Sequence, residues 1–456
     1  HPGRRKTTRT RITIKFEQKV KIMHIRTKQL LLLATCSTWL CSIFAADNLP
    51  FVEPESVGFS SDQLAKIENH FQGRVDRGEI AGIVTLVARN GKIAHLSAVG
   101  YQDVVQNIPM ETDTLFRIFS MTKPIASTAL MMLYQDGYFQ LTDPLSKFIP
   151  EFANLRVLRD PNGSITRTEE MDREPTVQDI LRHTAGFSHG LGTQEYDEAF
   201  LDSGIFRPET SLEEMMEALA DLPLMNQPGS AYRYSIGPDV ALRLVEIMSG
   251  MPADEYLQQK IFDRLGMSET GYVIEADDAN RLAPVHWLKD GSLVPINEEY
   301  GSPNGGVLVE DWLLNNYTLD HEFKGGSLGL VSTAADYWRF AQAILNGGEL
   351  NGQRVLGPKT VNYMSRNHLT EQQNQTFSPG LGFGLGFATI EDPTAAGVQY
   401  VSSEGTFYWS GAAATMFWID PSEDIVVVAM TQHRGVPGTG RLRGELNALI
   451  YGALID

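Results

Sequence analysis

The apolar positions of the chain follow a helical spacing first and then change to two β-type runs. Residues 64–71 repeat apolar side chains at intervals of three and four after Ser60 and Ser61, so the sequence predicts a helix there. Apolar residues then dominate 82–88 and 92–99, and the Asn-Gly pair between these runs is typical of a tight turn. We therefore expect a helix followed by a β-hairpin.

Between residues 121 and 270 the apolar positions keep a helical spacing, and no long β-type run interrupts them. Residues 155–175 are polar and contain Pro-Asn-Gly, so we expect a loop there. The predicted helices of this region are 121–135, 175–183, 212–220, 239–248 and 252–262.

Strand-forming segments return after residue 325. Thr333 is placed to cap a helix that runs to residue 345, and a final helix is expected at 440–455. Between them, apolar runs at 412–419 and 425–431 flank a polar turn, which predicts a second hairpin. Strands thus lie at both ends of the chain and helices between them. The pattern predicts an α/β fold with two parts, a sheet domain of residues 47–120 and 325–456 and a mostly helical inserted domain of 121–324.

The composition is that of a globular protein with a large core. Of the 456 residues, 42% are apolar and 21% are charged, which fits one or two domains. The formal net charge is -18. Such an acidic chain repels phosphate groups, so we expect no nucleic-acid partner.

The first 45 residues differ from the rest. Residues 1–22 are basic and show no periodicity, so we interpret them as an upstream or non-native leader. Met23 then opens a short basic stretch, and an apolar segment follows over 30–45. This order is typical of a secretory signal peptide at 23–45 and predicts an exported protein, periplasmic or secreted, with no membrane span after cleavage. A membrane anchor is the alternative, although the apolar segment is short for one.

Both cysteines, Cys36 and Cys41, lie in this apolar segment. Cleavage near Ala45 would leave none, which excludes a thiol nucleophile, a disulfide framework and thiolate metal sites. A lipid anchor at Cys36 remains an alternative. The isolated histidines (for example His183, His189 and His433) have no metal-ligand spacing, so we predict no metal and no cofactor.

The strongest chemical signal is the sequence around Ser120. A β-prone run ends at this serine, and Pro124 marks the first turn of the following helix, where its missing N–H would be unbonded in any case. Lys123 lies three residues after Ser120, so the two side chains share one helix face. A serine hydroxyl needs a base to take its proton, and a buried lysine amine can be that base. A capping serine beside a solvated lysine is the structural alternative.

Two later stretches supply candidate partners. Tyr234 precedes a predicted helix, and a tyrosine that shares a proton with a lysine can carry it between nucleophile and leaving group. Near the C-terminus, Trp-Ser-Gly-Ala at 409–412 opens a predicted strand. Small residues there let a backbone N–H face a reacting carbonyl group. Packing of the tyrosine and an ordinary strand start are the alternatives.

A rival nucleophile is Ser188, which lies in a Gly-x-Ser-x-Gly sequence at 186–190. That sequence marks the nucleophile elbow of α/β-hydrolases when a strand precedes it and a helix follows it. Here a predicted helix precedes it and a polar loop follows. The context therefore argues against Ser188.

Three motifs appear in one order along the chain, namely Ser120-Met121-Thr122-Lys123, Tyr234-Ser235 and Trp409-Ser410-Gly411. With the flanking stretches 181–186, 228–229 and 329–336, the chain resembles the serine β-lactamase and penicillin-binding protein superfamily over about residues 52–455. It looks most like the family VIII carboxylesterases, which are related to class C β-lactamases. The resemblance implies a β-lactamase-like fold, an antiparallel sheet flanked by helices and built from both chain ends, with a helical domain inserted.

The resemblance also implies a role for each matching residue. Ser120 would be the nucleophile, and Lys123 and Tyr234 would share the general base and acid roles. The backbone N–H groups of Ser120 and Ala412 would form the oxyanion hole. The other residues of the third motif that it places at the substrate site are Trp409, Ser410 and Gly411.

Two departures from the β-lactamase pattern bear on the substrate. Ile236 takes the position of the asparagine in Tyr-x-Asn, and Trp409 takes that of the lysine in Lys-Thr-Gly. Both argue against β-lactam hydrolysis. We predict a carboxylesterase (EC 3.1.1.-) that cleaves short- to medium-chain esters, with a small-molecule ester as its partner.

Other functions of this superfamily remain as alternatives. They are a β-lactamase, a D-Ala-D-Ala carboxypeptidase or transpeptidase, an acyltransferase and a non-catalytic, penicillin-sensor-like binding module. The presence of all three reactive residues argues against the binding module. The natural ester, the enantiopreference and the oligomeric state stay open.

Overall fold

A computed structural model describes residues 49–190, 192, 194–297, 299–301, 317–397, 400–435 and 438–455. The leader and signal peptide inferred from the sequence, with both cysteines, lie outside these residues and stay predictions. Within the described ranges, no helix is long and apolar enough to cross a membrane.

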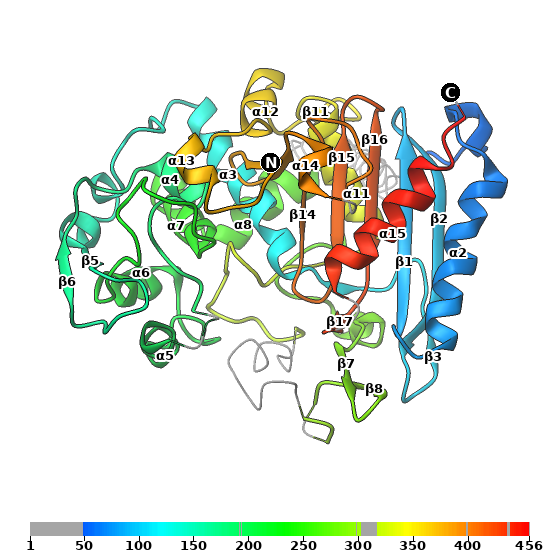
Figure 1. Cartoon of the computed structure of the whole chain (residues 1–456), viewed down its shortest axis with the longest axis horizontal. Coiled ribbons are helices and arrows are strands. Elements are labelled where there is room, and N and C mark those ends of the chain that lie inside the picture. The colour runs from blue at the N-terminus through cyan, green and yellow to red at the C-terminus, as the bar shows by residue number, and fades with distance from the viewer. Residues whose placement is uncertain are drawn as a thin grey trace, which may run out of the picture. The chain divides into compact units, whose positions relative to one another are not determined.

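One large sheet takes its strands from both ends of the chain (Figure 1). Its order is β12-β13-β14-β15-β16-β1-β2-β3, and every neighbouring pair is antiparallel. This confirms the predicted α/β fold with an antiparallel sheet. The strands are β1 (Gly82–Arg89), β2 (Lys92–Asp103), β3 (Ile108–Pro109), β12 (Leu381–Phe383), β13 (Ala388–Ile390), β14 (Phe407–Ser410), β15 (Met416–Asp420) and β16 (Ile425–Met430).

Strand β1 joins the two parts of this sheet, because it pairs with β2 on one side and with β16 on the other. The predicted β1–β2 hairpin is confirmed. Its turn residues Asn90 and Gly91 have φ angles of 54° and 69°, the left-handed conformation that a two-residue hairpin turn requires. All of β1 except Arg89 is buried, so both faces of the strand must be covered.

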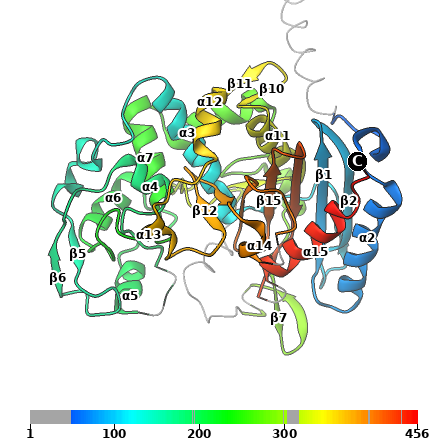
Figure 2. The ribbon, with the colours of Figure 1, turned by 45° about the horizontal axis from the view of Figure 1, so that its top comes forward.

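Helices supply that cover (Figures 1 and 2). Helix α2 (Ser61–Asp76) and helix α15 (Thr439–Tyr451) contact each other and share one apolar cluster with strand residues such as Ile83 and Val427. Helix α11 (Ala334–Leu345) contacts β1, β15 and β16. Because β1 is buried on both faces, α11 lies on the face opposite α2 and α15.

The helices between the two sets of strands gather around α7 (Gly237–Ser249). Helix α7 contacts α3, α4, α6 and α8, and α3 also contacts α8. The contacts of Pro50–Asp456 form a single unit, so the domain boundaries inferred from the sequence stay predictions. The helices of this region are α3 (Thr122–Gln135), α4 (Val177–Leu181), α5 (Glu195–Asp202), α6 (Leu212–Ala220), α8 (Ala253–Leu257), which continues as a π-helix over Gln258–Phe262, and α9 (Asp263–Leu265).

Short strand pairs and helices complete the structure. Strand β4 (Phe116–Arg117) pairs with β9 (Val331–Ser332), outside the large sheet. The other short strands are β5 (Arg156–Leu158), β6 (Thr168–Glu170), β7 (His286–Lys289), β8 (Ser292–Pro295), β10 (Glu349–Leu350), β11 (Gln353–Arg354) and β17 (His433–Arg434). The remaining α-helices are α12 (Pro358–Met364), α13 (Glu371–Asn374) and α14 (Pro393–Ala396).

Some local predictions were wrong. Residues 155–175 hold the hairpin of β5 and β6, because Val157 and Leu158 are buried and give the segment an apolar side. The strand expected from 412 begins only at Met416. Ahead of it the chain makes a turn, in which Gly411 N–H donates to Thr415 O at 2.8 Å and Ala414 has a φ of 63°.

Candidate active site

The nucleophile candidate Ser120 lies in a short 3₁₀ turn, Phe119–Met121, between strand β4 and helix α3. The sequence analysis placed it at the end of a strand, but β4 already ends at Arg117. Phe119 has a φ of 44°, which is rare for a large aromatic residue. Such backbone strain at a residue beside a reactive group is common at functional sites. Ser120 is half-buried, and its position just before α3 exposes it to the positive end of the helix dipole.

Lys123 points its amine at this serine. The Lys123 Nζ atom lies 3.3 Å from Ser120 Oγ and donates to the carbonyl oxygen of Ser327 at 2.8 Å. The lysine side chain is almost fully buried, and its Nζ lies 4.6 Å from the centre of the Tyr234 ring. The structure therefore does not support the alternative of a solvated lysine.

Tyr234 approaches the same hydroxyl from the segment before helix α7. Its OH lies 2.8 Å from Ser120 Oγ, within hydrogen-bond distance. The three candidate catalytic residues therefore meet at one oxygen atom. Either the lysine amine or the tyrosine oxygen is near enough to take the proton of Ser120.

A ring of aromatic side chains fixes Tyr234. Its ring centre lies 4.9 Å from that of His183, 5.5 Å from His189 and 5.4 Å from Trp409. His183 Nδ1 accepts the N–H of Ser235 at 3.2 Å, so the residue after the tyrosine is held as well. Burial lowers the pKa of His183 well below 6.5, and the imidazole is neutral at pH 7.

The sequence analysis assigned no role to His183 beyond a structural or solvated one. Its only signal was its place in the stretch 181–186, which contributed to the family resemblance. The structure shows a buried, neutral ring packed between Tyr234 and two further aromatic side chains, Tyr232 and Phe383.

The third motif reaches the site through a close backbone contact. A Cβ atom added to Gly411 would lie 2.4 Å from Ile118 O and 2.2 Å from Thr415 Oγ1, so only glycine fits between these atoms. Thr415 Oγ1 also donates to Ile118 O at 3.3 Å. The end of strand β14 is thus held against the Ser120 turn. Ser410 is the last residue of β14 and Ala412 is exposed; the oxyanion role of the Ala412 N–H stays a prediction.

Trp409 forms an apolar wall of the site. Its ring centre lies 5.3 Å from that of Phe383 in an edge-to-face arrangement, in addition to its contact with Tyr234. A tryptophan here presents a broad uncharged surface next to the reactive tyrosine.

A cavity of about 560 Å³ opens beside Tyr234. Both polar and apolar side chains line it, among them His189, Asn226, Tyr232, Arg233 and Thr376. A volume of this size accommodates a small organic molecule.

Ser188, the rival nucleophile, also lines this cavity, but its surroundings are not those of a nucleophile elbow. Helix α4 precedes it at Val177–Leu181 where a strand would be needed, and the next helix, α5, begins only at Glu195. Its side chain is buried, and the Oγ atom accepts the N–H of Gly190 at 3.4 Å.

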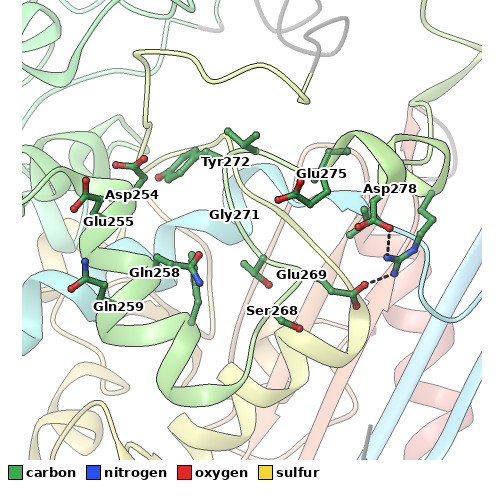
Figure 3. A pocket seen from close by; sticks show the side chains of 16 residues that line it. Asp254, Glu255, Gln258, Gln259, Ser268, Glu269, Gly271, Tyr272, Glu275 and Asp278 are labelled. Carbon is green, nitrogen blue, oxygen red and sulfur yellow. Dashed lines mark hydrogen bonds and ion pairs between the residues drawn. The ribbon is translucent and has the colours of Figure 1, made fainter. Parts of the chain in front are cut away.

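A second cavity, of about 400 Å³, is lined by none of the three candidate catalytic residues (Figure 3). It is rich in carboxylates, of which Glu269 and Asp278 form ion pairs with Arg281. Within the described ranges, no group of three or more histidine, cysteine, aspartate or glutamate residues could hold a metal ion.

Two buried histidines support the turn that carries Ala412. His433 N–H donates to Ala413 O at 3.0 Å, and His433 is the register partner of His286 in the β17–β7 pair. Burial lowers the pKa of each imidazole from 6.5 to about 4. The unfolded chain binds protons on these two imidazoles more readily than the folded chain does. The stability of the folded chain that depends on the neutral imidazoles is therefore fully present above pH 6.5 and is lost as the pH falls towards 4.

We therefore expect the free energy of unfolding to be smaller at pH 5 than at pH 7.5, by up to about 2 kcal/mol for each of these histidines. Chemical denaturation at the two pH values measures the difference. In the variant His433→Leu the difference should shrink, because one of the two histidines that take up a proton on unfolding is gone. Neither ring nitrogen of His433 has a hydrogen-bond partner within the described ranges, so the substitution breaks no side-chain hydrogen bond there. An unchanged difference would contradict this explanation.

Comparisons with known proteins identify the family of the chain. The protein-family model described as Beta-lactamase matches residues 67–451. Esterase EstB of Burkholderia gladioli is 28% identical over 414 residues, which cover 88% of this chain and 98% of the relative. A putative D-alanyl-D-alanine carboxypeptidase of Salmonella agona (strain SL483) is 26% identical over 450 residues, covering 92% and 96%.

Among solved structures, the chain is similar to EstCE1, described as a hydrolase with promiscuous acyltransferase activity. The TM-score is 0.72 at 26% identity, over 86% of this chain and 99% of the other. The family match spans most of the chain, and the antiparallel sheet with its helices agrees with this structural neighbour. The chain therefore belongs to the β-lactamase family and is an enzyme of the superfamily of serine hydrolases that includes both β-lactamases and esterases.

Proposed function

We propose that the protein is a serine carboxylesterase that hydrolyses short- to medium-chain neutral esters through an acyl-enzyme on Ser120. One observation carries the proposal: Lys123 Nζ and Tyr234 OH both lie within hydrogen-bond distance of Ser120 Oγ, at 3.3 and 2.8 Å. A serine hydroxyl in contact with an amine and a phenol oxygen can pass its proton to one of these groups as it attacks a carbonyl carbon.

In the acylation step, Ser120 Oγ attacks the ester carbonyl and its proton passes to the Lys123–Tyr234 pair. The N–H groups of Ser120 and Ala412 would stabilise the negative oxygen of the tetrahedral intermediate. The carbon–oxygen bond to the alcohol then breaks, and the pair returns the proton to the departing alkoxide. An acyl-serine and a free alcohol result.

In the deacylation step, a water molecule gives its proton to the same pair and attacks the acyl carbon. The bond to Ser120 Oγ breaks, the serine regains a proton, and a carboxylic acid leaves. An alcohol in place of the water would give a new ester. Acyl transfer is therefore a second candidate function, which the similarity to EstCE1 supports.

Trp409 favours neutral substrates. The lysine that β-lactamases carry at this position provides a positive charge that can attract a substrate carboxylate. Trp409 provides an uncharged aromatic face next to Tyr234. The acidic chain, with a formal net charge of -18, adds a long-range repulsion of anions.

A substrate panel tests the proposal. It contains p-nitrophenyl esters of increasing chain length, the β-lactam nitrocefin and a D-Ala-D-Ala peptide, all in one buffer. We expect the highest kcat/KM for short- to medium-chain esters. A preference for the peptide would favour a carboxypeptidase, the activity suggested by the name of the Salmonella relative.

The variant Trp409→Lys should change this selectivity. Restoring one charge-assisted hydrogen bond to a carboxylated substrate is worth about 1.5–3 kcal/mol, or roughly ten- to a hundredfold in affinity. We therefore expect the ratio of kcat/KM for nitrocefin to that for p-nitrophenyl butyrate to rise by this factor. Trp409→Phe is the matched control, which keeps the apolar face and adds no charge. A wild-type enzyme that prefers nitrocefin would overturn the esterase assignment and leave the Ser120 mechanism intact.

A further inference from the structure

The mechanism makes no use of Asp239, a carboxylate in the first turn of helix α7 and five residues after Tyr234. Its side chain is completely buried. A buried carboxylate is costly unless other groups compensate for its charge, so its contacts are informative.

Asp239 and Lys123 both form hydrogen bonds with the backbone of Ser327, one with its N–H and the other with its carbonyl oxygen. Asp239 Oδ1 accepts the N–H of Ser327 at 3.1 Å, and the carbonyl oxygen of the same Ser327 accepts from Lys123 Nζ at 2.8 Å. The other oxygen, Asp239 Oδ2, has no hydrogen-bond partner within the described ranges. Among the ion pairs of the described residues, none joins Asp239 to Lys123 directly, and the link between them runs through the backbone of Ser327.

The segment that carries Ser327 is clamped at both ends. A Cβ atom added to Gly326 would lie 2.0 Å from Pro238 O, so this glycine allows the segment to touch the start of helix α7. Tyr272 OH donates to Gly325 O at 2.9 Å. At the other end, Ile118 N–H donates to Leu330 O at 3.0 Å, which ties the segment to the Ser120 turn.

We propose that Asp239 is a positioning residue for Lys123: it holds the backbone of Ser327 so that the Ser327 carbonyl fixes the amine at Ser120 Oγ. The proposal rests on the proposed function, because it concerns the same nucleophile.

The other titratable groups around this pair are Tyr234, His183, His189 and Tyr272. Burial lowers the pKa of His183 and His189 and raises that of Tyr272, so at pH 7 and above these three are uncharged. Burial also raises the pKa of Asp239 itself, while the nearby Lys123 charge lowers it.

A purely structural role is the competing explanation, because an aspartate in the first turn of any helix is stabilising. Asp336 offers a matched control. It lies in the first turn of helix α11, its side chain is almost fully buried, and its Oδ2 accepts the backbone N–H of Glu269 at 2.8 Å. In the part of the chain that the structure describes, no hydrogen bond of Asp336 leads to the Lys123 amine.

The experiment measures how fast a fluorophosphonate probe labels Ser120, which requires an activated nucleophile but no particular ester. We expect Asp239→Ala to label at least tenfold more slowly than the wild type, and its kcat for p-nitrophenyl butyrate to fall with little change in KM. Asp336→Ala should lower the melting temperature while its labelling rate stays within about threefold of the wild type. Equal slowing in both variants, or a wild-type rate in a folded Asp239→Ala, would overturn the proposal.

Asp239→Asn separates the hydrogen bond from the charge. Its Oδ1 can still accept the Ser327 N–H, so the labelling rate at the plateau of the pH profile should stay within about threefold of the wild type. Labelling at least tenfold slower than the wild type in a folded Asp239→Asn would overturn the proposal even if Asp239→Ala does not fold, because this variant keeps the acceptor for the Ser327 N–H. If the wild type is labelled but hydrolyses none of the esters, the proposed function fails and the labelling comparison still decides the role of Asp239.

Discussion

Replacing Ser120 by alanine should abolish ester hydrolysis, with a loss of at least about 10⁴-fold in kcat, the scale seen when a covalent nucleophile is removed. The expected loss is large because no other nucleophile is in contact with the Lys123 amine and the Tyr234 hydroxyl within the described ranges. The side chain of Ser120 is small and half-buried, so the variant should fold. Hydrolysis of p-nitrophenyl butyrate and mass spectrometry of a fluorophosphonate adduct measure the effect.

Ser188→Ala is the control for this prediction. Ser188 lies in a Gly-x-Ser-x-Gly sequence and borders the cavity beside Tyr234, but a helix precedes it and its Oγ accepts a backbone N–H. We expect this variant to keep most of its activity. Full activity in Ser120→Ala, or complete loss in Ser188→Ala, would refute the assignment of the nucleophile.

Much of the fold could be predicted from the sequence because its signals are local. The Asn90-Gly91 turn and the cap Thr333 each depend on a few neighbouring residues, and the structure confirms both. The continuous apolar run of β1 and the helical spacing of α6 are equally local. Because these signals are local, they predicted the type of an element correctly in several places where the predicted first or last residue of that element was wrong.

Contacts between distant segments could not be predicted in this way. The turn at 411–415 depends on Thr415 and on the approach of Gly411 to Ile118 O, which lies almost three hundred residues earlier. The sequence alone showed only an apolar run there. The hairpin of β5 and β6 was missed for a related reason, since Val157 is buried through contacts outside its own segment.

The residues of the candidate site also fall into those that a local motif predicts and those that depend on contacts between distant segments. Ser120 and Lys123 form a local motif, so their contact followed from spacing on a turn. Tyr234 was a candidate partner because it precedes a predicted helix, and the family resemblance supplied its role, but its contact with Ser120 was not evident from the pattern of the chain. His183 and Asp239 carry no motif of their own, and their places beside Tyr234 and Ser327 emerge only when α4, α7 and the segment after residue 325 pack together.

Lys123 and Tyr234 allow a sharper test of how the proton moves, because each has a matched variant that removes only the polar group. Lys123→Met keeps most of the buried stem without the amine. Tyr234→Phe keeps the ring that contacts His183, Trp409 and Lys123, and loses only the hydroxyl at 2.8 Å from Ser120. Each should lower kcat by roughly 10²–10⁴, the usual contribution of general acid–base catalysis.

The double variant decides whether the two groups act as one unit. If Lys123 and Tyr234 take part in one shared proton transfer, the kcat of the double variant should be only slightly lower than that of the less active single variant. The reason is that the energetic contributions of residues that act together are not additive. Independent roles would instead multiply the two losses. The measurement is kcat for p-nitrophenyl butyrate across a pH series, with melting temperatures to show that each variant is folded. A rise in KM at unchanged kcat in either single variant would show that its group only binds substrate, and the proton-transfer role would then be wrong.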